Sequence, residues 1–233
     1  MKPIIVISPS VSENGEELKL SRACFDAVSK AGGLGLVTDY KNIDDILKTA
    51  NGILLSGGGD IEPKLTNDEA DNENRGFIFE ERDIFELELI RRAVEKKIPV
   101  LGICRGMQVA GAAFGGHIIQ HFEGHRQEKP KNETSHFVNI KKDSLLYDIT
   151  GTERLCVNSF HHQAVGDGTR LKISAVSDDG RIEAVEGEDS FLLGVQWHPE
   201  YLCDDEKQMK IFKAFIEAAG RYKECYGRYF TVL

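Results

Sequence analysis

Val100-Leu101-Gly102-Ile103-Cys104-Arg105-Gly106 is the stretch of sequence that decides the fold. Its first four residues form a short apolar run directly after Pro99, which is typical of a buried strand. The small residues of 106–114 predict a helix that can pack closely on a sheet. Gly102 and Gly106 suit a sharp strand-to-helix corner, where the backbone crowds itself and leaves no room for side chains. The stretch therefore predicts a β-strand, a tight turn and an α-helix in direct succession.

Working outward, strand-like and helix-like segments alternate through the first half of the chain. We expect strands over 3–7, 34–37, 52–55 and 100–103, and helices over 18–31, 44–50, 80–97 and 106–114. Shorter strands follow over 137–140, 155–157, 171–176, 182–186 and 192–195, and a final helix over 205–219 closes the pattern. Alternating β and α units predict an α/β fold with a mostly parallel central sheet and helices on both faces. We expect one domain over residues 1–233.

Composition and charge limit the function classes. The 233 residues are 41% apolar, which excludes a disordered chain, and 29 Lys and Arg against 38 Asp and Glu give a net charge of −9. An acidic chain without a basic block argues against nucleic acid or an anionic membrane as the main partner. No apolar run reaches the length of a membrane span. Five cysteines without a C-x-x-C pair indicate a reducing compartment, so we expect a soluble cytoplasmic protein.

Cys104 is the first candidate for chemistry. It occupies the middle of a G-x-C-x-G turn, where the side chain is exposed at the amino terminus of the predicted helix. The helix dipole and a nearby imidazolium would lower the pKa of such a thiol and make it a nucleophile. The alternative is a buried structural cysteine, the usual fate of a cysteine in a cytosolic protein.

A second candidate stretch is Gly194-Val195-Gln196-Trp197-His198-Pro199-Glu200, just past a predicted strand. In an extended H-x-E segment the imidazole can be directed toward a thiol while the carboxylate fixes its tautomer. Taken alone, a surface histidine with a solvated glutamate is the commoner interpretation. Cys104, His198 and Glu200 at predicted strand ends together favour a catalytic triad.

The third candidate is the glycine-rich segment Ser56-Gly57-Gly58-Gly59-Asp60, which follows the strand over 52–55. Backbone N–H groups of such a segment suit an oxyanion hole together with the N–H of Arg105. A phosphate cradle and a plain turn are the other interpretations. Because neither a P-loop nor a complete dinucleotide fingerprint is present, nucleotide binding is rejected.

Other polar residues have commoner explanations. His117, His121 and His125 recur every four residues, but the glycines before them favour strand and loop over a metal-binding helix. His161 and His162 are neighbours that would point in different directions. The acidic segment 60–73 is expected to be a solvated loop, although it could attract a cationic amine. The aromatic tail 221–233 leaves two interpretations open, packing on the body of the chain or on a second copy in a homodimer.

Together these residues resemble the class I glutamine amidotransferase-like superfamily, and within it the γ-glutamyl-γ-aminobutyrate hydrolase (peptidase C26) family. The G-x-C-x-G and H-P-E elements are shared by the superfamily. Arg105 after the nucleophile and the N-S-x-H-H-Q-A-V stretch over 158–165 resemble the hydrolase branch. The segment 65–79 departs from that family by being strongly acidic, which leaves the leaving group open.

The resemblance implies a flavodoxin-like fold and a cysteine-dependent hydrolysis of a small γ-glutamyl amide, without metal or organic cofactor. Cys104 would be the nucleophile, His198 the general base and acid, and Glu200 its orienting residue. The oxyanion would rest on the N–H groups of Gly58 and Arg105. The resemblance further implies a substrate pocket formed by Gly57, Gln108, Ser159, His161 and His162. Two other functions stay open: a glutaminase subunit that delivers ammonia to a synthase, and a non-catalytic binding protein.

Overall fold

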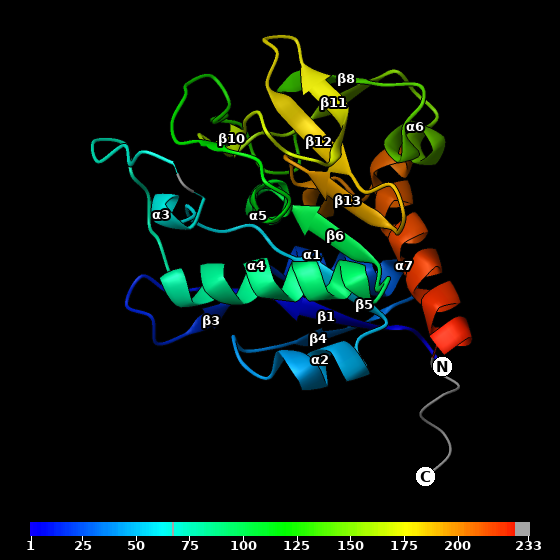
Figure 1. The fold of residues 1–233 in the computed structure, drawn as a ribbon. Coiled ribbons are helices and arrows are strands. Elements are labelled where there is room, and N and C mark those ends of the chain that lie inside the picture. Colours follow the sequence, from blue (N-terminus) through cyan, green and yellow to red (C-terminus); the bar gives the residue numbers. More distant parts are fainter. Residues whose placement is uncertain (67, 227–233) are drawn as a thin grey trace.

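A mixed nine-stranded sheet organises the chain, with strand order β4-β1-β5-β6-β13-β12-β11-β8-β9 (Figure 1). The computed structural model describes residues 1–66 and 68–226. The sheet strands are β1 (Ile4–Ser8), β4 (Leu34–Val37), β5 (Gly52–Leu55), β6 (Val100–Ile103), β8 (His136–Ile140), β9 (Arg154–Val157), β11 (Lys172–Ser177), β12 (Ile182–Glu186) and β13 (Leu192–Val195). Two small sheets pair β2 (Ser10–Val11) with β3 (Leu18–Lys19), and β7 (Ile118–Ile119) with β10 (Ala164–Val165).

Strand direction divides the large sheet into two halves. Neighbours are parallel from β4 to β13 and antiparallel from β13 to β9. It follows that only β12 and β8 run against the other seven strands of this sheet. The expected α/β fold with a mostly parallel sheet is confirmed. The antiparallel half is built from the shorter strands of the second half of the sequence.

Helices cover both faces of the sheet. They are α1 (Arg22–Lys30), α2 (Ile43–Thr49), α3 (Pro63–Thr66), α4 (Glu80–Glu95), α5 (Arg105–Ala113), α6 (Leu145–Thr150) and α7 (Glu206–Tyr226), with a 3₁₀ turn η1 (Pro199–Tyr201). One apolar core joins α1, α6 and α7 to the sheet, and a second core joins α2, α4 and α5 to the opposite face. The end of α7 lies beside the amino terminus (Figure 1), where Lys223 Nζ donates to the Met1 carbonyl at 2.8 Å.

Several element boundaries differ from the expectation. The helix expected over 18–31 begins only at Arg22, because Ser21 caps it by accepting a hydrogen bond from the N–H of Ala23. Leu18 and Lys19 instead form β3. The last helix continues to Tyr226, seven residues past the expected end, and α3 and α6 were not anticipated. Tyr222 and Tyr226 stack on each other at 4.8 Å, whereas Tyr229 and Phe230 lie outside the described residues.

The carboxyl ends of β5, β6 and β13 lie side by side, which determines where the candidate residues meet. Leu55 pairs with Gly102, and Ile103 pairs with Val195. The three segments that follow these strands therefore leave the sheet at the same edge, the usual position of ligand sites in open α/β sheets.

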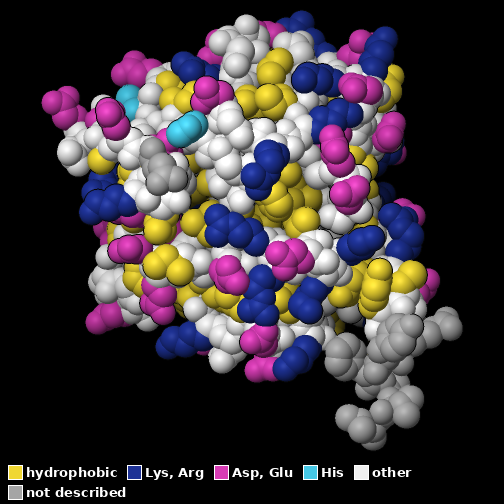
Figure 2. All heavy atoms as spheres, in the orientation of Figure 1, with side chains coloured by type: hydrophobic (Ala, Val, Ile, Leu, Met, Phe, Trp, Pro, Cys, Tyr) yellow, Lys and Arg dark blue, Asp and Glu magenta, His cyan; other side chains and the backbone are white. Residues whose placement is uncertain are grey.

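The surface is charged and mixed. On the face shown in Figure 2, Lys and Arg side chains alternate with Asp and Glu over most of the area. Within residues 1–66 and 68–226, no helix combines the length and apolar character that crossing a bilayer requires.

Candidate active site

Cys104 lies at the corner between β6 and α5 in a strained backbone conformation with positive φ. Its φ of 53° and ψ of −107° lie outside the regions that non-glycine residues favour. A Cβ on Gly102 would lie 2.5 Å from the Gly106 carbonyl oxygen, and one on Gly106 would lie 2.2 Å from the Leu55 carbonyl oxygen. The two glycines are thus required by close backbone approach, and they hold Cys104 at the first turn of α5.

His198 and Glu200 form a hydrogen-bonded pair beside this cysteine. His198 Nδ1 lies 2.7 Å from Glu200 Oε1, and Asn158 bonds to both the N–H and the carbonyl of His198 at 2.8 and 3.0 Å. A Cβ on Gly57 would lie 2.9 Å from His198 Cε1 and 3.7 Å from Cys104 Cβ. The imidazole and the thiol side chain therefore border the same glycine, with the imidazole oriented by the carboxylate.

Electrostatics favour the charged imidazole. Burial opposes protonation, but the Glu200 carboxylate and the thiolate of Cys104 outweigh it and hold the pKa of His198 well above its usual value. The arrangement can thus support a thiolate–imidazolium pair. Gln196 adds a further contact, because its Nε2 donates to Cys104 Sγ at 3.6 Å.

A buried ion network supports the glycine segment 56–60 from behind. Arg82 donates to the carbonyl oxygens of Ser56 at 2.9 Å and Gly57 at 3.3 Å, and its Nε donates to Glu86 at 2.9 Å. Arg105 turns its side chain into the same network and pairs with Glu86 and Asp83. Its backbone N–H stays at the start of α5, where no partner within the helix exists.

A cavity of about 170 Å³ opens next to Cys104. It is lined by Gly58, Gly59, Asp60, Gly76, Phe77, Cys104, Arg105, Gln108, Arg126, Phe160, His161, His162 and Gln163. The sequence-predicted Gly58, Arg105, Gln108, His161 and His162 thus come together with the thiol. Gly57 and Ser159, also predicted for the pocket, do not line this cavity. Ser159 is buried, and its hydroxyl donates to the His125 carbonyl at 2.6 Å, so it supports the wall from behind.

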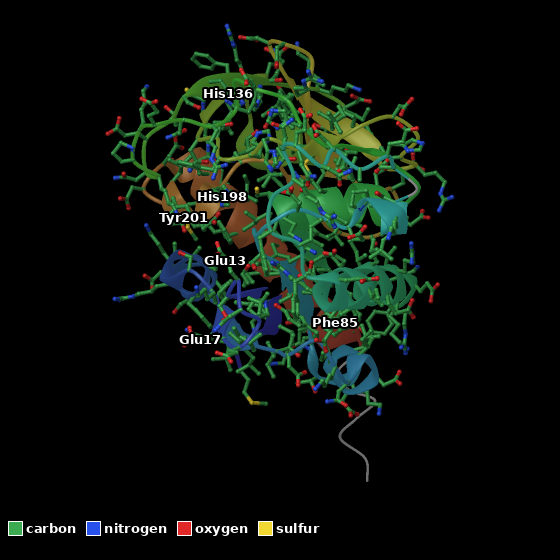
Figure 3. All side chains as sticks on the ribbon, turned by 90° about the vertical axis from the view of Figure 1, so that its left-hand side faces the viewer. Glu13, Glu17, Phe85, His136, His198 and Tyr201 are labelled. Atoms are coloured by element: carbon green, nitrogen blue, oxygen red, sulfur yellow. The ribbon has the colours of Figure 1, made fainter. Side chains whose placement is uncertain are left out.

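A second cavity of about 740 Å³ borders His198. Its lining comprises Ser10, Leu18, Lys19, Leu20, Ser21, Cys24, Ser56, Gly57, Gly58, Lys131, His198, Glu200 and Tyr201. Gly58 belongs to both cavities, and Gly57 faces this one. Figure 3 shows His198 and Tyr201 next to each other, and their ring centroids are 5.8 Å apart.

The acidic segment contributes less to these cavities than its charge suggests. Asp60 lines the smaller one and accepts from His162 Nε2 at 2.9 Å. Asp68 accepts from the N–H of Ile118 at 2.8 Å and lies 2.8 Å from His117 Nδ1, while Glu62 pairs with Arg75 at 2.5 Å. The acidic side chains thus bind to neighbours in the protein, and the second cavity is bordered by lysines.

Several residues of the site were not anticipated from the sequence. Arg126 and Phe160 line the smaller cavity, Gln196 contacts the thiol, and Arg82 and Glu86 support the glycine segment. Gln196 lies within the quoted Gly194–Glu200 stretch, so the periodicity of β13 could have indicated it. Arg126 is in a long loop with no local signal, and only the tertiary fold brings it to the cavity.

His117, His121 and His125 lie outside the helices, around the short strand β7 and in the loop after it, as the preceding glycines predicted. His117 contacts Asp68, His121 lies 3.1 Å from His162, and His125 lies 3.2 Å from His161. His161 and His162 point in different directions, as expected. The group formed by His125, His161 and Glu183 is close enough to hold a metal ion.

Comparisons with known proteins agree with this fold. The model of the peptidase C26 family matches residues 3–200. The chain is 34% identical to a Rickettsia prowazekii protein named "Putative glutamine amidotransferase-like protein", over 94% of this chain and 98% of that one. It is 30% identical to the γ-glutamyl-γ-aminobutyrate hydrolase PuuD of Escherichia coli, over 87% of each chain.

The fold also matches a solved structure. A Thermoplasma acidophilum protein described as a "putative gmp synthase subunit a protein" superposes with a TM-score of 0.71 at 14% identity, over 97% of this chain and 98% of that one. At this identity the likeness concerns the fold alone. The family match over most of the chain, together with relatives at 30% identity and above, shows that this chain belongs to the peptidase C26 family.

Proposed function

We propose that the chain hydrolyses a γ-glutamyl amide and releases glutamate through a thioester on Cys104. The observation that carries this proposal is the meeting of Cys104, the His198–Glu200 pair and the 170 Å³ cavity at the carboxyl edge of the parallel strands. A cavity of that size suits a short polar acyl group. Asp60 and Arg126 on its wall offer one negative and one positive charge, which suits the α-ammonium and α-carboxylate of a glutamyl group.

In the first half of the reaction the thiolate of Cys104 attacks the γ-carbonyl carbon. The carbonyl oxygen becomes an oxyanion that accepts hydrogen bonds from the backbone N–H groups of Gly58 and Arg105, each worth about 3–4 kcal/mol in the transition state. The imidazolium of His198 then gives its proton to the departing amine nitrogen, the C–N bond breaks, and the thioester remains. Glu200 holds the imidazole in the required tautomer throughout.

In the second half a water molecule replaces the amine. Neutral His198 takes a proton from this water, and the resulting hydroxide attacks the thioester carbon. The C–S bond breaks, the thiolate of Cys104 is restored, and glutamate leaves. One water is consumed for each amide cleaved, and the proton balance closes on His198.

The second cavity is the proposed site of the leaving amine, because it borders His198, the proposed proton donor, and shares Gly58 with the smaller cavity. Lys19 and Lys131 line it, and Lys131 Nζ lies 4.9 Å from the centroid of the Tyr201 ring. Two lysines favour a leaving group with a negative end, such as the carboxylate of γ-aminobutyrate, over a polyamine.

The direct test measures glutamate release by the purified protein from γ-glutamyl-γ-aminobutyrate, γ-glutamyl-putrescine and glutamine. We expect the fastest release from the first, slower release from the second, and little from glutamine. A Cys104→Ser variant should release none from any of them. Equal activity of the wild type and this variant would contradict the proposal.

A glutaminase subunit is the second candidate, and the amidotransferase-like name of the Rickettsia prowazekii relative favours it. It would act on glutamine and be stimulated by a synthase partner. Slow hydrolysis of glutamine, with neither γ-glutamyl-γ-aminobutyrate nor γ-glutamyl-putrescine cleaved, would support this candidate and exclude a free-standing hydrolase of substituted amides.

A further inference from the structure

A second histidine–carboxylate group lies in the antiparallel half of the molecule. His125 comes from the loop after β7, His161 from the segment after β9, and Glu183 from β12. These residues are 5%, 4% and 0% exposed. Figure 3 shows the neighbouring His136 high in the molecule, well separated from His198. The group is therefore distinct from the His198–Glu200 pair.

The outer ring nitrogens of this group fix its tautomers. His161 Nδ1 lies 3.0 Å from the Gln163 carbonyl oxygen, which can only accept, so Nδ1 carries the proton. His125 Nε2 lies 3.3 Å from both carboxylate oxygens of Asp179, which assigns its proton to Nε2 in the same way. In these neutral tautomers the inner nitrogens, His125 Nδ1 and His161 Nε2, present lone pairs. The alternative is a proton on His125 Nδ1, which lies 3.1 Å from Glu183 Oε1, and the test below distinguishes the two. A carbonyl or carboxylate behind the imidazole is the usual support of a metal-binding histidine.

The inner atoms converge with Glu183 at the spacing of a tetrahedral metal site. His125 Nδ1 lies 3.1 Å from Glu183 Oε1 and 3.2 Å from His161 Nε2, and His161 Nε2 lies 3.6 Å from Glu183 Oε1. Ligands at the usual zinc distances of about 2.0–2.2 Å are separated by about 3.3–3.6 Å around a tetrahedral ion. Two of the observed spacings, 3.1 and 3.2 Å, are slightly shorter than this range, and the third, 3.6 Å, lies at its upper end.

Three electron-pair donors this close repel one another unless a cation lies between them. In the described part of the chain, neither oxygen of the fully buried Glu183 receives a hydrogen bond, nor does His136 Nε2 have a partner. His136 Nε2 lies 3.4 Å from Glu183 Oε1 and is the nearest further ligand. Burying a carboxylate without a partner raises the free energy of the folded state, and a bound cation offsets this increase.

We propose that His125, His161 and Glu183 bind a divalent transition-metal ion of the zinc class, with His136 as the fourth ligand. Imidazole nitrogens and one carboxylate oxygen select such an ion over magnesium or calcium, which prefer all-oxygen sites. The family resemblance implied a protein without a metal, and this proposal differs from that expectation. The proposal is independent of the hydrolase function.

The position of the ion gives it a structural role. His161 also lines the cavity beside Cys104, and Phe160 and His162 on either side of it do the same. A metal bond from His161 to Glu183 would attach this wall to β12. Loss of the ion should therefore loosen the wall and lower stability, while Cys104 and His198 keep their own contacts.

The test uses the full chain purified without a polyhistidine tag or chelator. Elemental analysis should find close to one equivalent of zinc-class metal per chain. After removal of the metal with a chelator, adding zinc at 100 times its Kd should raise Tm by at least about 5 °C. Cobalt in place of zinc should give the visible d–d absorption of a four-coordinate ion. Glu183→Gln and His125→Gln should abolish these effects, and the surface variant His117→Gln should keep them.

Two results would overturn the proposal. One is metal below a tenth of an equivalent together with no change of Tm when zinc or cobalt is added to the wild type. Since this measurement uses the unaltered chain, it stays decisive even if the variants fail to fold. The other is retention of the cobalt spectrum in Glu183→Gln. Either outcome would mean that a proton on His125, shared with Glu183, occupies the centre of the group.

Discussion

The two histidine–carboxylate groups of this protein contain the same residue types and differ in where the protons lie. In the His198–Glu200 pair the carboxylate faces Nδ1, the thiol side chain of Cys104 borders the same glycine as the ring, and the second cavity borders the ring. In the group around Glu183, the outer acceptors are the Asp179 carboxylate and the Gln163 carbonyl, which accept the ring protons. The inner ring nitrogens converge on the Glu183 carboxylate. The first arrangement suits proton transfer, and the second suits cation binding. The partner on the far side of the ring thus decides which chemistry a histidine can support.

The largest expected difference comes from one isosteric change made in each group. Glu200→Gln removes the carboxylate that orients His198, so kcat/KM for a γ-glutamyl amide should fall about 10³-fold, or roughly 4 kcal/mol. Glu183→Gln should instead remove the metal ion. Steady-state kinetics and elemental analysis of both variants separate the two effects. If Glu200→Gln lost less than about 10-fold in activity, or lost its metal ion, the predicted difference between the two groups would be wrong.

A second comparison concerns two fully buried carboxylates, Glu86 and Glu183. Glu86 accepts hydrogen bonds from Arg82, Arg105 and Ser8, whereas Glu183 lacks hydrogen-bond partners in the described structure. Arg82→Met breaks a buried ion network and should lower the free energy of unfolding by about 3 kcal/mol. It should also lower kcat by loosening Ser56 and Gly57.

The matched control for this prediction is Arg221→Met. Arg221 pairs with Glu217 at 2.6 Å on the surface of α7, where both side chains are more than half exposed. Exposed pairs contribute less than about 1 kcal/mol, so urea unfolding of this variant should be nearly unchanged. Equal destabilisation by the two variants would mean that the buried network is not important for stability.

The sequence alone predicted much of this fold and of the first group. The strands over 34–37, 52–55, 100–103, 182–186 and 192–195 form as expected. In all but 182–186, a short run of apolar residues and glycine bounded by turn residues has few alternatives. The sheet register then brings Gly57, Cys104 and His198 to one edge. Local motifs suffice there because each residue directly follows a strand.

The group around Glu183 could not be predicted in this way. Its members come from two loops and a strand, up to 58 positions apart, and each is unremarkable in its own segment. His125 was considered only with His117 and His121, at a helical spacing that the loop does not adopt. The ion network had part of the same difficulty. Arg82 and Glu86 are an i,i+4 pair on α4, but Arg105 meets Glu86 only after α5 packs on α4. Long-range contacts without a local pattern are what sequence reasoning missed.

A smaller effect concerns the pH dependence of the His198–Glu200 pair. The pKa of His198 is raised, so its imidazolium persists to higher pH than usual and is lost as the pH passes that pKa. Activity should therefore fall on the alkaline side of the kcat/KM profile. Glu200→Gln removes one cause of the raised pKa and should move this limb to lower pH. The reverse movement, or none, would show that Glu200 does not interact with the charged imidazole.

The smallest expected effect tests whether a positive charge on the wall of the second cavity acts on the leaving group, without any effect on the metal ion. Lys131→Met removes a positive charge from its wall, so KM for γ-glutamyl-γ-aminobutyrate should rise about 3–5-fold, the scale of an exposed charge interaction. KM for γ-glutamyl-butylamine, which lacks the terminal carboxylate, should stay unchanged, and so should the metal content. Lys129→Met is the control, because Lys129 is nearby and does not line this cavity. If Lys131→Met raised both KM values equally, the lysine would act on the fold of the wall and not on the charge of the leaving group.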